Sequence, residues 1–295
     1  MPPASRELVA VTDSLVEGVH FPVGSPPASI GHRAFAVNLS DIAAMGAEAA
    51  WALLALTMPD SDDQWLEQFA RAAGDLCRRH GVSLVGGDTT RGPLSITVTI
   101  HGFVAEGAAI LRSGARVGDA VYVTGTLGDA AAGLRCLDTN DSEANRLLTA
   151  PPGARASLIE RLNRPMPRVA QGLALRGRAT AGIDVSDGLL ADLGHICTAS
   201  GVGAEIDVDA LPSSSALLAL FDGEARRTFQ LGGGDDYELC FTANETSAAN
   251  LLGDLARSGC AATRVGRIVA EPGVRIYDGA GQAVTLPHAG WEHFA

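Results

Sequence analysis

Residues 36–47 of the chain read AVNLSDIAAMGA, a run of small and apolar side chains with one carboxylate, Asp41. The small residues predict a helix over about Ser29–Met45, and Gly46 stands where a helix commonly stops. Asp41 closes the short motif Asn38-Leu39-Ser40-Asp41. The same pairing of an aspartate with Gly, Ser or Thr recurs in other parts of the chain, and it points to the chemistry of the protein.

The recurring segments are Thr12-Asp13-Ser14, Gly86-Gly87-Asp88-Thr89-Thr90, Asp184-Val185-Ser186-Asp187-Gly188 and Gly232-Gly233-Gly234-Asp235-Asp236. Hard divalent cations such as Mg²⁺ bind carboxylate, hydroxyl and phosphate oxygens. If several segments converge, they hold metal ions between protein carboxylates and a polyphosphate. Each aspartate taken singly is also a common helix cap or turn residue. The chain has no lysine, which excludes a Walker P-loop and any Schiff-base mechanism, so metal, arginine or backbone N–H groups must neutralise phosphate.

Composition narrows the class of protein. The 295 residues are 46% hydrophobic and 19% charged, which is typical of a globular protein, and the net charge of −12 disfavours binding to nucleic acid or anionic lipid. The five cysteines lack CxxC spacing, and we expect buried thiols in a reducing compartment. No apolar run reaches about 18 residues and no signal peptide opens the chain, so we expect a cytoplasmic protein without membrane contact.

The periodicity predicts an α+β fold with two lobes. For the first lobe we expect strands at Glu7–Thr12, Trp51–Met58, Val82–Val85 and Ser95–Val104, and a second helix that starts at a Ser61–Gln64 capping box and ends near Gly81. A polar, Gly-containing stretch at 106–118 places the boundary between domains 1–108 and 109–295. For the second lobe we expect strands at Ala120–Thr124, Ala204–Val208, Tyr237–Thr242 and Thr263–Val269, and helices from about Gly128, near Pro167, near Leu189 and at Ser247–Arg257.

Six motifs, in order along nearly the whole chain, resemble those of the thiamine-monophosphate kinase family, in the superfamily of aminoimidazole ribonucleotide synthetase. They are TDSLVEGVHF at 12–21, AVNLSDIAAMGA at 36–47, GGDTTRG at 86–92, RSGA at 112–115, DVSDGL at 184–189 and DYEL at 236–239. The resemblance implies ATP-dependent phosphorylation of thiamine monophosphate to thiamine diphosphate with several Mg²⁺ ions. It also implies a homodimer in which the sheets of the N-terminal, ATP- and metal-binding lobes pair, with a C-terminal α/β lobe beyond.

The resemblance also implies the site residues. The metal ligands are expected to be Thr12, Asp13, Asp41, Asp88, Asp184 and Asp187. The expected ATP contacts are Gly87, Asp88, Arg112 and Ser186, and the expected substrate contacts are His20, Asp235 and Trp291. No His, Ser or Cys in the motifs is placed as a covalent relay, so we expect direct in-line transfer in which the metal cluster carries catalysis.

Two departures from the family pattern are visible. Asp235 stands where the family usually has Glu. Family members also usually carry a first helix and a Gly-Asp-Asp strand before the segment that starts here near Arg6. Either the chain starts further upstream or this is a shortened form that lacks one metal carboxylate, and for the shortened form we expect a deficit that shrinks as Mg²⁺ rises.

Other readings remain open. Within the superfamily, the selenium enzyme needs an early Cys, whereas the first here is Cys77, and the hydrogenase-maturation protein ends in a reactive Cys tail, whereas this chain ends His293-Phe294-Ala295. Aminoimidazole ribonucleotide synthetase itself is a third relative. A non-catalytic protein that binds nucleotide or thiamine phosphate is the alternative of a different class.

Overall fold

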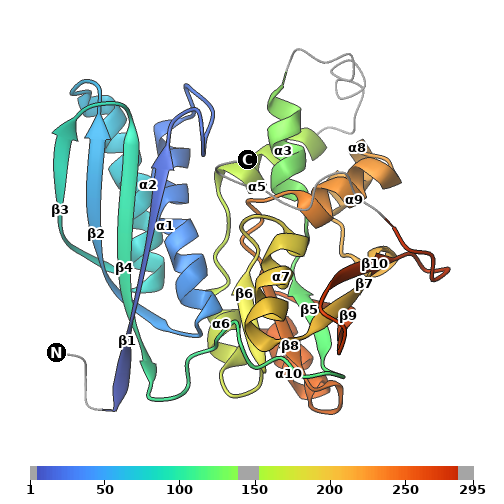
Figure 1. Ribbon diagram of the computed structural model, residues 1–295. Coiled ribbons are helices and arrows are strands. Elements are labelled where there is room, and N and C mark those ends of the chain that lie inside the picture. Colours follow the sequence, from blue (N-terminus) through green and yellow to red (C-terminus); the bar gives the residue numbers. More distant parts are fainter. Residues whose placement is uncertain (1–4, 139–152, 285–295) are drawn as a thin grey trace. The chain divides into compact units, whose positions relative to one another are not determined.

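The computed structural model describes residues 5–138 and 153–284 (Figure 1). The chain forms two compact units. The first comprises Met1–Ala109 and Asn163–Leu173, and the second comprises Ile110–Leu162 and Ala174–Ala295. Each unit contains its own sheet, and the expectation of a mixed α/β protein is confirmed. A cut between residues 109 and 110 lies beside the expected boundary, and the later segment 163–173 returns to the first unit.

The first unit is a four-stranded sheet in the order β1-β4-β2-β3. Its strands are β1 (Arg6–Val16), β2 (Glu48–Met58), β3 (Ser83–Arg91) and β4 (Ser95–Ala105). β1 and β2 pair with β4 in antiparallel fashion, while β3 lies parallel to β2 at the edge. The parallel pair requires a crossover, which α2 (Asp63–His80) provides. The other helix, α1 (Pro27–Ala44), packs on α2 and on the sheet.

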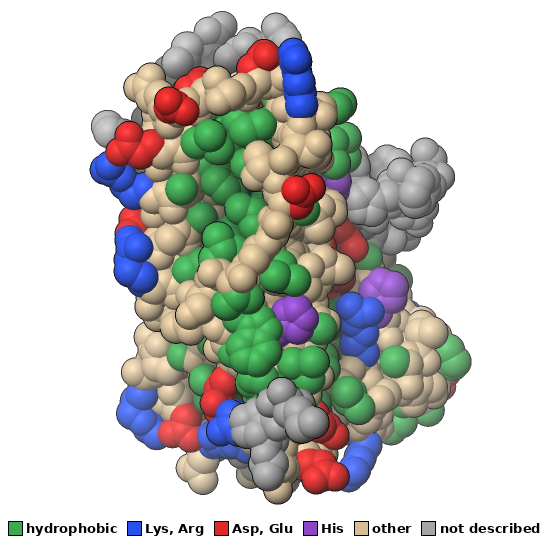
Figure 2. All heavy atoms as spheres, turned by 90° about the vertical axis from the view of Figure 1, so that its left-hand side faces the viewer, with side chains coloured by type: hydrophobic (Ala, Val, Ile, Leu, Met, Phe, Trp, Pro, Cys, Tyr) green, Lys and Arg blue, Asp and Glu red, His purple; other side chains and the backbone are tan. Residues whose placement is uncertain are grey.

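Alternation of buried and half-buried residues from Ser95 to Gly102 of β4 separates the two faces of this sheet. Ile96, Val98 and Ile100 are buried on the face that α1 and α2 cover. The residues between them point to the opposite, open face. Cross-strand pairing places Leu8 of β1 opposite Phe103 and Leu53 of β2 opposite Thr99, so both leucines belong to the open face, and they are 50% and 40% exposed. Figure 2 shows hydrophobic side chains gathered along the middle of this side of the molecule.

Two details of the first unit correct the sequence analysis. The N-cap of α2 is Asp62 and not Ser61, because the Asp62 carboxylate accepts hydrogen bonds from the amides of Gln64 and Trp65 at 2.9 and 3.0 Å. The predicted capping box is therefore wrong by one residue, whereas the predicted end at Gly81 is confirmed by its left-handed φ of 68°. In addition, β1 continues to Val16, so Asp13 lies inside the strand and does not terminate it.

The segment 163–173 is fastened to α1. The Nε2–H group of His32 donates to the Pro165 carbonyl at 2.8 Å, and His32 is buried. Helix α6 (Val169–Leu175) begins in this segment, and a Cβ on its Gly172 would lie 2.0 Å from the Ala43 carbonyl oxygen. Only glycine permits this approach of α6 to the end of α1.

The second unit is built on a six-stranded sheet in the order β10-β7-β9-β5-β8-β6. Its strands are β5 (Ala120–Thr124), β6 (Ala181–Asp184), β7 (Gly203–Asp207), β8 (Leu239–Ala243), β9 (Ala262–Val269) and β10 (Gly273–Tyr277). Its helices are α3 (Asp129–Leu137), α5 (Ala154–Asn163), α7 (Leu189–Ser200), α8 (Ser215–Leu220), α9 (Gly223–Gly232), α10 (Glu245–Arg257) and the 3₁₀ turn η1 (Val208–Ala210). The core packs α7 against the sheet through Leu193, Ile196, Val123 and Ile183.

All five cysteines are free and buried, which confirms the expectation of buried thiols. Among the described residues, no helix combines the length and the apolar character needed to cross a membrane.

Candidate functional site

The predicted site residues are distributed over both units. Thr12, Asp13, His20, Asp41, Gly87 and Asp88 lie in the first, and Arg112, Asp184, Ser186, Asp187 and Asp235 lie in the second. Trp291 lies outside the described residues.

In the second unit, two site segments run side by side. One is Asp184–Gly188, between β6 and α7, and the other is Gly232–Tyr237, between α9 and β8. The Asp235 amide donates to the Ser186 carbonyl at 2.8 Å, and the Tyr237 amide donates to the Val185 carbonyl at 2.8 Å. The main chains of the two segments thus pair, and the structure brings Asp235 beside Ser186, within the stretch that also carries Asp184 and Asp187.

Glycine makes this close pairing possible. A Cβ at Gly234 would lie 2.4 Å from the Ser186 carbonyl oxygen, and a Cβ at Gly188, whose φ is 112°, would lie 2.9 Å from the Gly232 carbonyl carbon. Asp235 and Tyr237 themselves adopt left-handed backbone angles, with φ of 71° and 51°. Such angles are uncommon for residues other than glycine and are typical of sites where surrounding contacts impose them.

A buried carboxylate that the motifs did not single out supports the first segment. Asp192 of α7 accepts hydrogen bonds from the amides of Ser186 and Asp187 at 3.0 and 3.1 Å. Burial raises the pKa of Asp192 to about 7, and the neighbouring charge of Asp184 adds to the rise. This excess of negative charge fits a site that binds cations, and Asp184 and Asp187 carry carboxylate oxygens, the type of ligand that Mg²⁺ prefers. The sequence signal for Asp192 was an aspartate in the first turn of a helix that follows the DVSDGL motif.

In the first unit, neighbouring residues of the TDS motif face opposite ways. The Thr12 hydroxyl lies on the open face, 2.9 Å from the Thr99 hydroxyl. Asp13 pairs with Val98 and points to the face that the helices cover. The Thr12 and Asp13 side chains therefore cannot bind one ion together, and a ligand from Thr12 beside Asp13 has to be its main-chain carbonyl.

The remaining carboxylates of the first unit are spread out. Asp41 lies in the last turn of α1, and Asp88 lies on the exposed edge strand β3, opposite Ala55. Within the described parts of the chain, no three His, Cys, Asp or Glu side chains lie close enough together to hold a metal ion. The complete metal cluster therefore stays a prediction.

Gly87 has a structural reason to be glycine. Its φ is 154°, and a Cβ would lie 1.9 Å from the Leu54 carbonyl oxygen of the neighbouring strand. The close approach of β2 by itself requires the missing side chain.

The His20 ring is held in one tautomer. Its Nδ1 accepts a hydrogen bond from the Val16 amide at 3.0 Å, so the neutral ring carries its proton on Nε2. Arg112 is exposed, and no hydrogen bond or ion pair joins its guanidinium to another described residue. Its backbone is fixed, because its carbonyl accepts from the Ser200 hydroxyl at 3.3 Å.

The family models of the AIR synthase related protein match the chain, the N-terminal domain over residues 2–104 and the C-terminal domain over residues 116–279. The thiamine-monophosphate kinase of Escherichia coli (strain K12) is 48% identical over 293 residues, which cover 99% of this chain and 88% of that protein.

Two solved structures are also similar along nearly the whole chain. The crystal structure of thiamine-monophosphate kinase from Stenotrophomonas maltophilia K279a superposes with a TM-score of 0.87 at 47% identity, covering 96% of this chain and 88% of that one. The structure of AaThiL complexed with AMPPCP and TMP superposes with a TM-score of 0.86 at 32% identity, covering 100% and 89%. These matches cover both lobes, including the six motifs and the paired glycine-rich segments. The chain belongs to the thiamine-monophosphate kinase family.

Proposed function

We propose that this chain transfers the γ-phosphoryl group of ATP to the phosphate of thiamine monophosphate, which yields thiamine diphosphate and ADP. The observation that carries the proposal is the pairing of Asp184–Gly188 with Gly232–Tyr237, since it sets carboxylates suited to a cation beside Asp235. The relationship to thiamine-monophosphate kinases supports it, as does the complex of AaThiL with AMPPCP and TMP.

Mg²⁺ is the proposed cofactor, and several ions are expected. Its proposed ligands are Asp13, Asp41, Asp88, Asp184 and Asp187, with the main-chain carbonyl of Thr12. When bound, the ions neutralise the phosphate oxygens, so that one anion can approach another. The carboxylates hold these charges in fixed positions, and such preorganised electrostatics is the main protein contribution to phosphoryl transfer.

The other site residues have distinct proposed roles. For ATP, Arg112 offers a guanidinium fork, and Gly87, Asp88 and Ser186 offer backbone and oxygen contacts. For thiamine monophosphate, the Nε2–H group of His20 is a donor that fits a phosphate oxygen, and Trp291 offers an aromatic ring for the cationic thiazolium. Asp235 is the proposed carboxylate contact to the same substrate.

The transfer is proposed to occur in one in-line displacement without a phosphoenzyme. The candidate site has no cysteine among its residues, and the Nδ1 of its histidine is already engaged by the Val16 amide. We therefore predict inversion of configuration at the γ-phosphorus of chiral ATP. Net retention would argue for a covalent intermediate and against this mechanism.

A second copy of the chain is the proposed partner, and the cytoplasm is the proposed location. The open face of the first unit's sheet carries exposed Leu8 and Leu53, whereas α1 and α2 both pack on the other face. An apolar sheet face without a cover is typical of an interface. Pairing of two such faces would give the homodimer.

The activity itself is tested by incubating the purified chain with ATP, Mg²⁺ and thiamine monophosphate. We expect thiamine diphosphate and ADP in equal amounts, and none when Mg²⁺ is chelated. Binding of ATP or thiamine monophosphate without ADP formation would contradict the proposal and favour the non-catalytic binding protein.

A further inference from the structure

Behind the Asp235 segment lies a buried polar network that none of the proposed roles uses. Its carboxylates are Asp129, Asp236 and Glu238, which are 2%, 1% and 0% exposed. They come from the start of α3 and from the motif DYEL. Three buried carboxylates so close together are costly unless they are paired and hydrogen-bonded.

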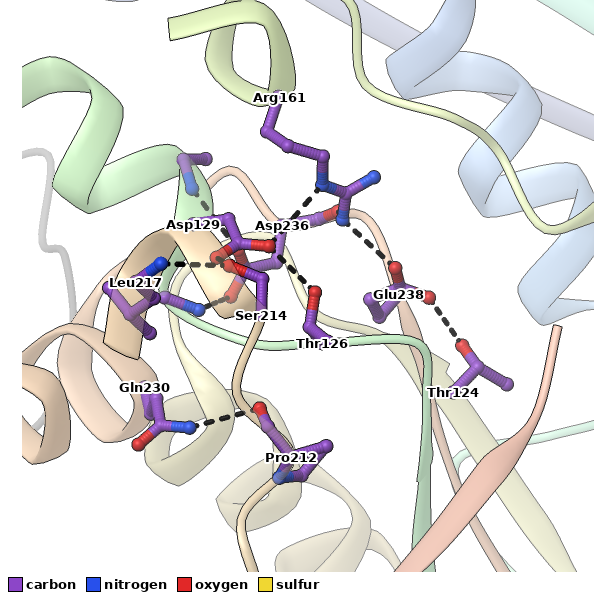
Figure 3. Close-up of polar contacts among 12 residues, drawn as sticks. Thr124, Thr126, Asp129, Arg161, Pro212, Ser214, Leu217, Gln230, Asp236 and Glu238 are labelled. Atoms are coloured by element: carbon purple, nitrogen blue, oxygen red, sulfur yellow. Dashed lines mark hydrogen bonds and ion pairs between the residues drawn. The ribbon is translucent and has the colours of Figure 1, made fainter. Parts of the chain in front are cut away.

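One guanidinium joins these carboxylates. Figure 3 shows Arg161 of α5 reaching between Asp129 and Glu238. Its Nη2 donates to Glu238 Oε1 at 2.9 Å, and its Nε lies 3.8 Å from Asp129 Oδ2. The same Nη2 reaches the Asp236 carbonyl at 3.5 Å. Arg161 therefore contacts the main chain of the 235–238 segment as well as a side chain that anchors it.

The two anchoring side chains flank Tyr237. Asp236 Oδ2 accepts from the Gly128 amide at 2.7 Å, and Glu238 Oε2 accepts from the Thr124 hydroxyl at 2.7 Å. Both anchors tie the segment to the turn between β5 and α3. Asp236 and Glu238 thus point inward, and the intervening Tyr237 hydroxyl turns to Asp235, donating to its Oδ1 at 3.2 Å.

The rest of the network braces the same turn. The Thr126 and Ser214 hydroxyls donate to the two oxygens of Asp129, each at 2.6 Å. The Ser214 oxygen also accepts from the Leu217 amide and caps α8. Both Asp129 oxygens therefore accept hydrogen bonds. The Asp129 carboxylate in turn pairs with the Nε side of the Arg161 guanidinium, while Glu238 pairs with its Nη2.

We propose that Arg161 is a positioning residue for the substrate carboxylate Asp235. Through Glu238, Asp129 and the Asp236 carbonyl it keeps the left-handed backbone at 235 and 237 in place beside Ser186. This rests on the proposed contact of Asp235 with thiamine monophosphate. Arg161 touches neither substrate, and its loss acts on thiamine monophosphate more than on ATP, because the segment it holds carries a thiamine monophosphate contact.

The test compares Arg161→Met and Arg161→Lys with the control Arg155→Met. Arg155 lies on the same helix and donates to the Cys136 carbonyl, away from the 235–238 segment. For Arg161→Met we expect the KM for thiamine monophosphate to rise between about tenfold and a hundredfold, with the KM for ATP unchanged. Arg161→Lys keeps the charge but not the planar fork, so it gives a smaller rise. Arg155→Met leaves both KM values unchanged.

A second measurement distinguishes local loosening of the 232–238 segment from a general loss of stability. Hydrogen exchange of the 232–238 amides is followed below the melting temperature of each variant, and Arg161→Lys replaces Arg161→Met if the latter does not fold. We expect faster exchange of these amides in the Arg161 variants only. An unchanged KM for thiamine monophosphate, or an equal rise in the KM for ATP, would overturn the inference.

The variant Asp235→Asn tests the proposed contact of Asp235 with thiamine monophosphate separately from the role of Arg161. We expect Asp235→Asn to raise the KM for thiamine monophosphate, and the double variant with Arg161→Met to add little. If Asp235→Asn changes the KM and Arg161→Met does not, only the role of Arg161 fails. If Asp235→Asn has no effect, the substrate contact fails and the role of Arg161 fails with it.

Discussion

At the scale of single residues, the aspartates of this chain differ in what already occupies their oxygens. Asp62, Asp192 and Asp236 accept hydrogen bonds from backbone amides, and these contacts explain their presence without a ligand. Asp88 is exposed on an edge strand, and no hydrogen bond or ion pair joins its side chain to another described residue. A carboxylate without a structural task is available to a metal ion.

We predict that Asp41→Asn and Asp88→Asn remove turnover and leave the fold intact, because both carboxylates are proposed metal ligands. Asparagine keeps the shape but not the charge that a cation site requires, and we expect turnover to fall by at least about a hundredfold. The measurement is the rate at limiting Mg²⁺, with circular dichroism as the check of folding. Asp60→Asn is the control, because Asp60 is exposed and forms only a surface ion pair with Arg91 at 3.5 Å. Turnover close to wild type would show that the two aspartates are not ligands.

A second prediction at this scale concerns Gly87. Alanine at 87 would meet the Leu54 carbonyl in a backbone conformation that L residues avoid, and we expect a loss of about 1–3 kcal/mol from the backbone angle alone. Urea unfolding without ligands measures it. Gly86→Ala is the matched control, since its Cβ would meet only the flexible end of Leu53 at 3.2 Å. Equal stability of the two variants would contradict the stated cause.

At the scale of elements, periodic segments were predictable and short ones were not. β5 and the end of α2 at Gly81 are as expected. The short strands β6 and β10 and the helices α5, α8 and α9 were not predicted from the sequence. β6 has four residues, AGID, and α8 has six, too few to display a period. α9 begins and ends in glycine, and glycine at both ends of a short segment predicts a loop when its tertiary contacts are not known.

Some features of the candidate site could likewise be predicted from the sequence, and others could not. Motifs could nominate Asp184, Ser186 and Asp235, because each stands in a recognisable short segment. They could not give the pairing of the two segments, which depends on hydrogen bonds between residues some 50 positions apart. Nor could they separate the faces of Thr12 and Asp13, since that needs the extent of β1. Arg161 lies in no motif, and only its contacts reveal it.

An element-scale prediction concerns pH and the fastening of segment 163–173 to α1. Burial lowers the pKa of His32, and the charges of Arg164, Arg79 and His80 lower it further. The folded chain thus binds fewer protons than the unfolded chain below pH 6.5, so stability is lost as pH falls below that value and is complete above it.

We expect the wild type to lose about 1 kcal/mol more than His32→Gln between pH 7.5 and 5.5, as measured by urea unfolding. Some dependence should remain in the variant, because burial also lowers the pKa of His80. His195→Gln, at an exposed position of α7, is the control. A wild type whose loss equals that of His32→Gln would overturn the assignment.

At the scale of the whole molecule, the open face of the first sheet sets the expected assembly. Leu53 lies in the row Thr12–Thr99–Leu53 across three strands. We predict that Leu53→Arg converts the proposed dimer to a monomer in analytical ultracentrifugation, because a buried unpaired charge is strongly unfavourable. Leu218→Arg, at a 53% exposed position of α8, should leave the dimer unchanged. A wild type that sediments as a monomer would contradict the proposed pairing.

The return of segment 163–173 to the first unit has a consequence for the order of synthesis. A ribosome delivers residues 1–109 first, then Ile110–Leu162 of the other unit, and only afterwards the segment that fastens to His32 and Ala43. Domains usually fold as they emerge. Here the first unit still lacks segment 163–173 when the last residue of its sheet has left the ribosomal exit tunnel. Until the chain has grown by roughly 60 more residues, segment 163–173 does not cover its contact surface on α1. A chaperone that binds nascent chains can bind this exposed surface during that interval.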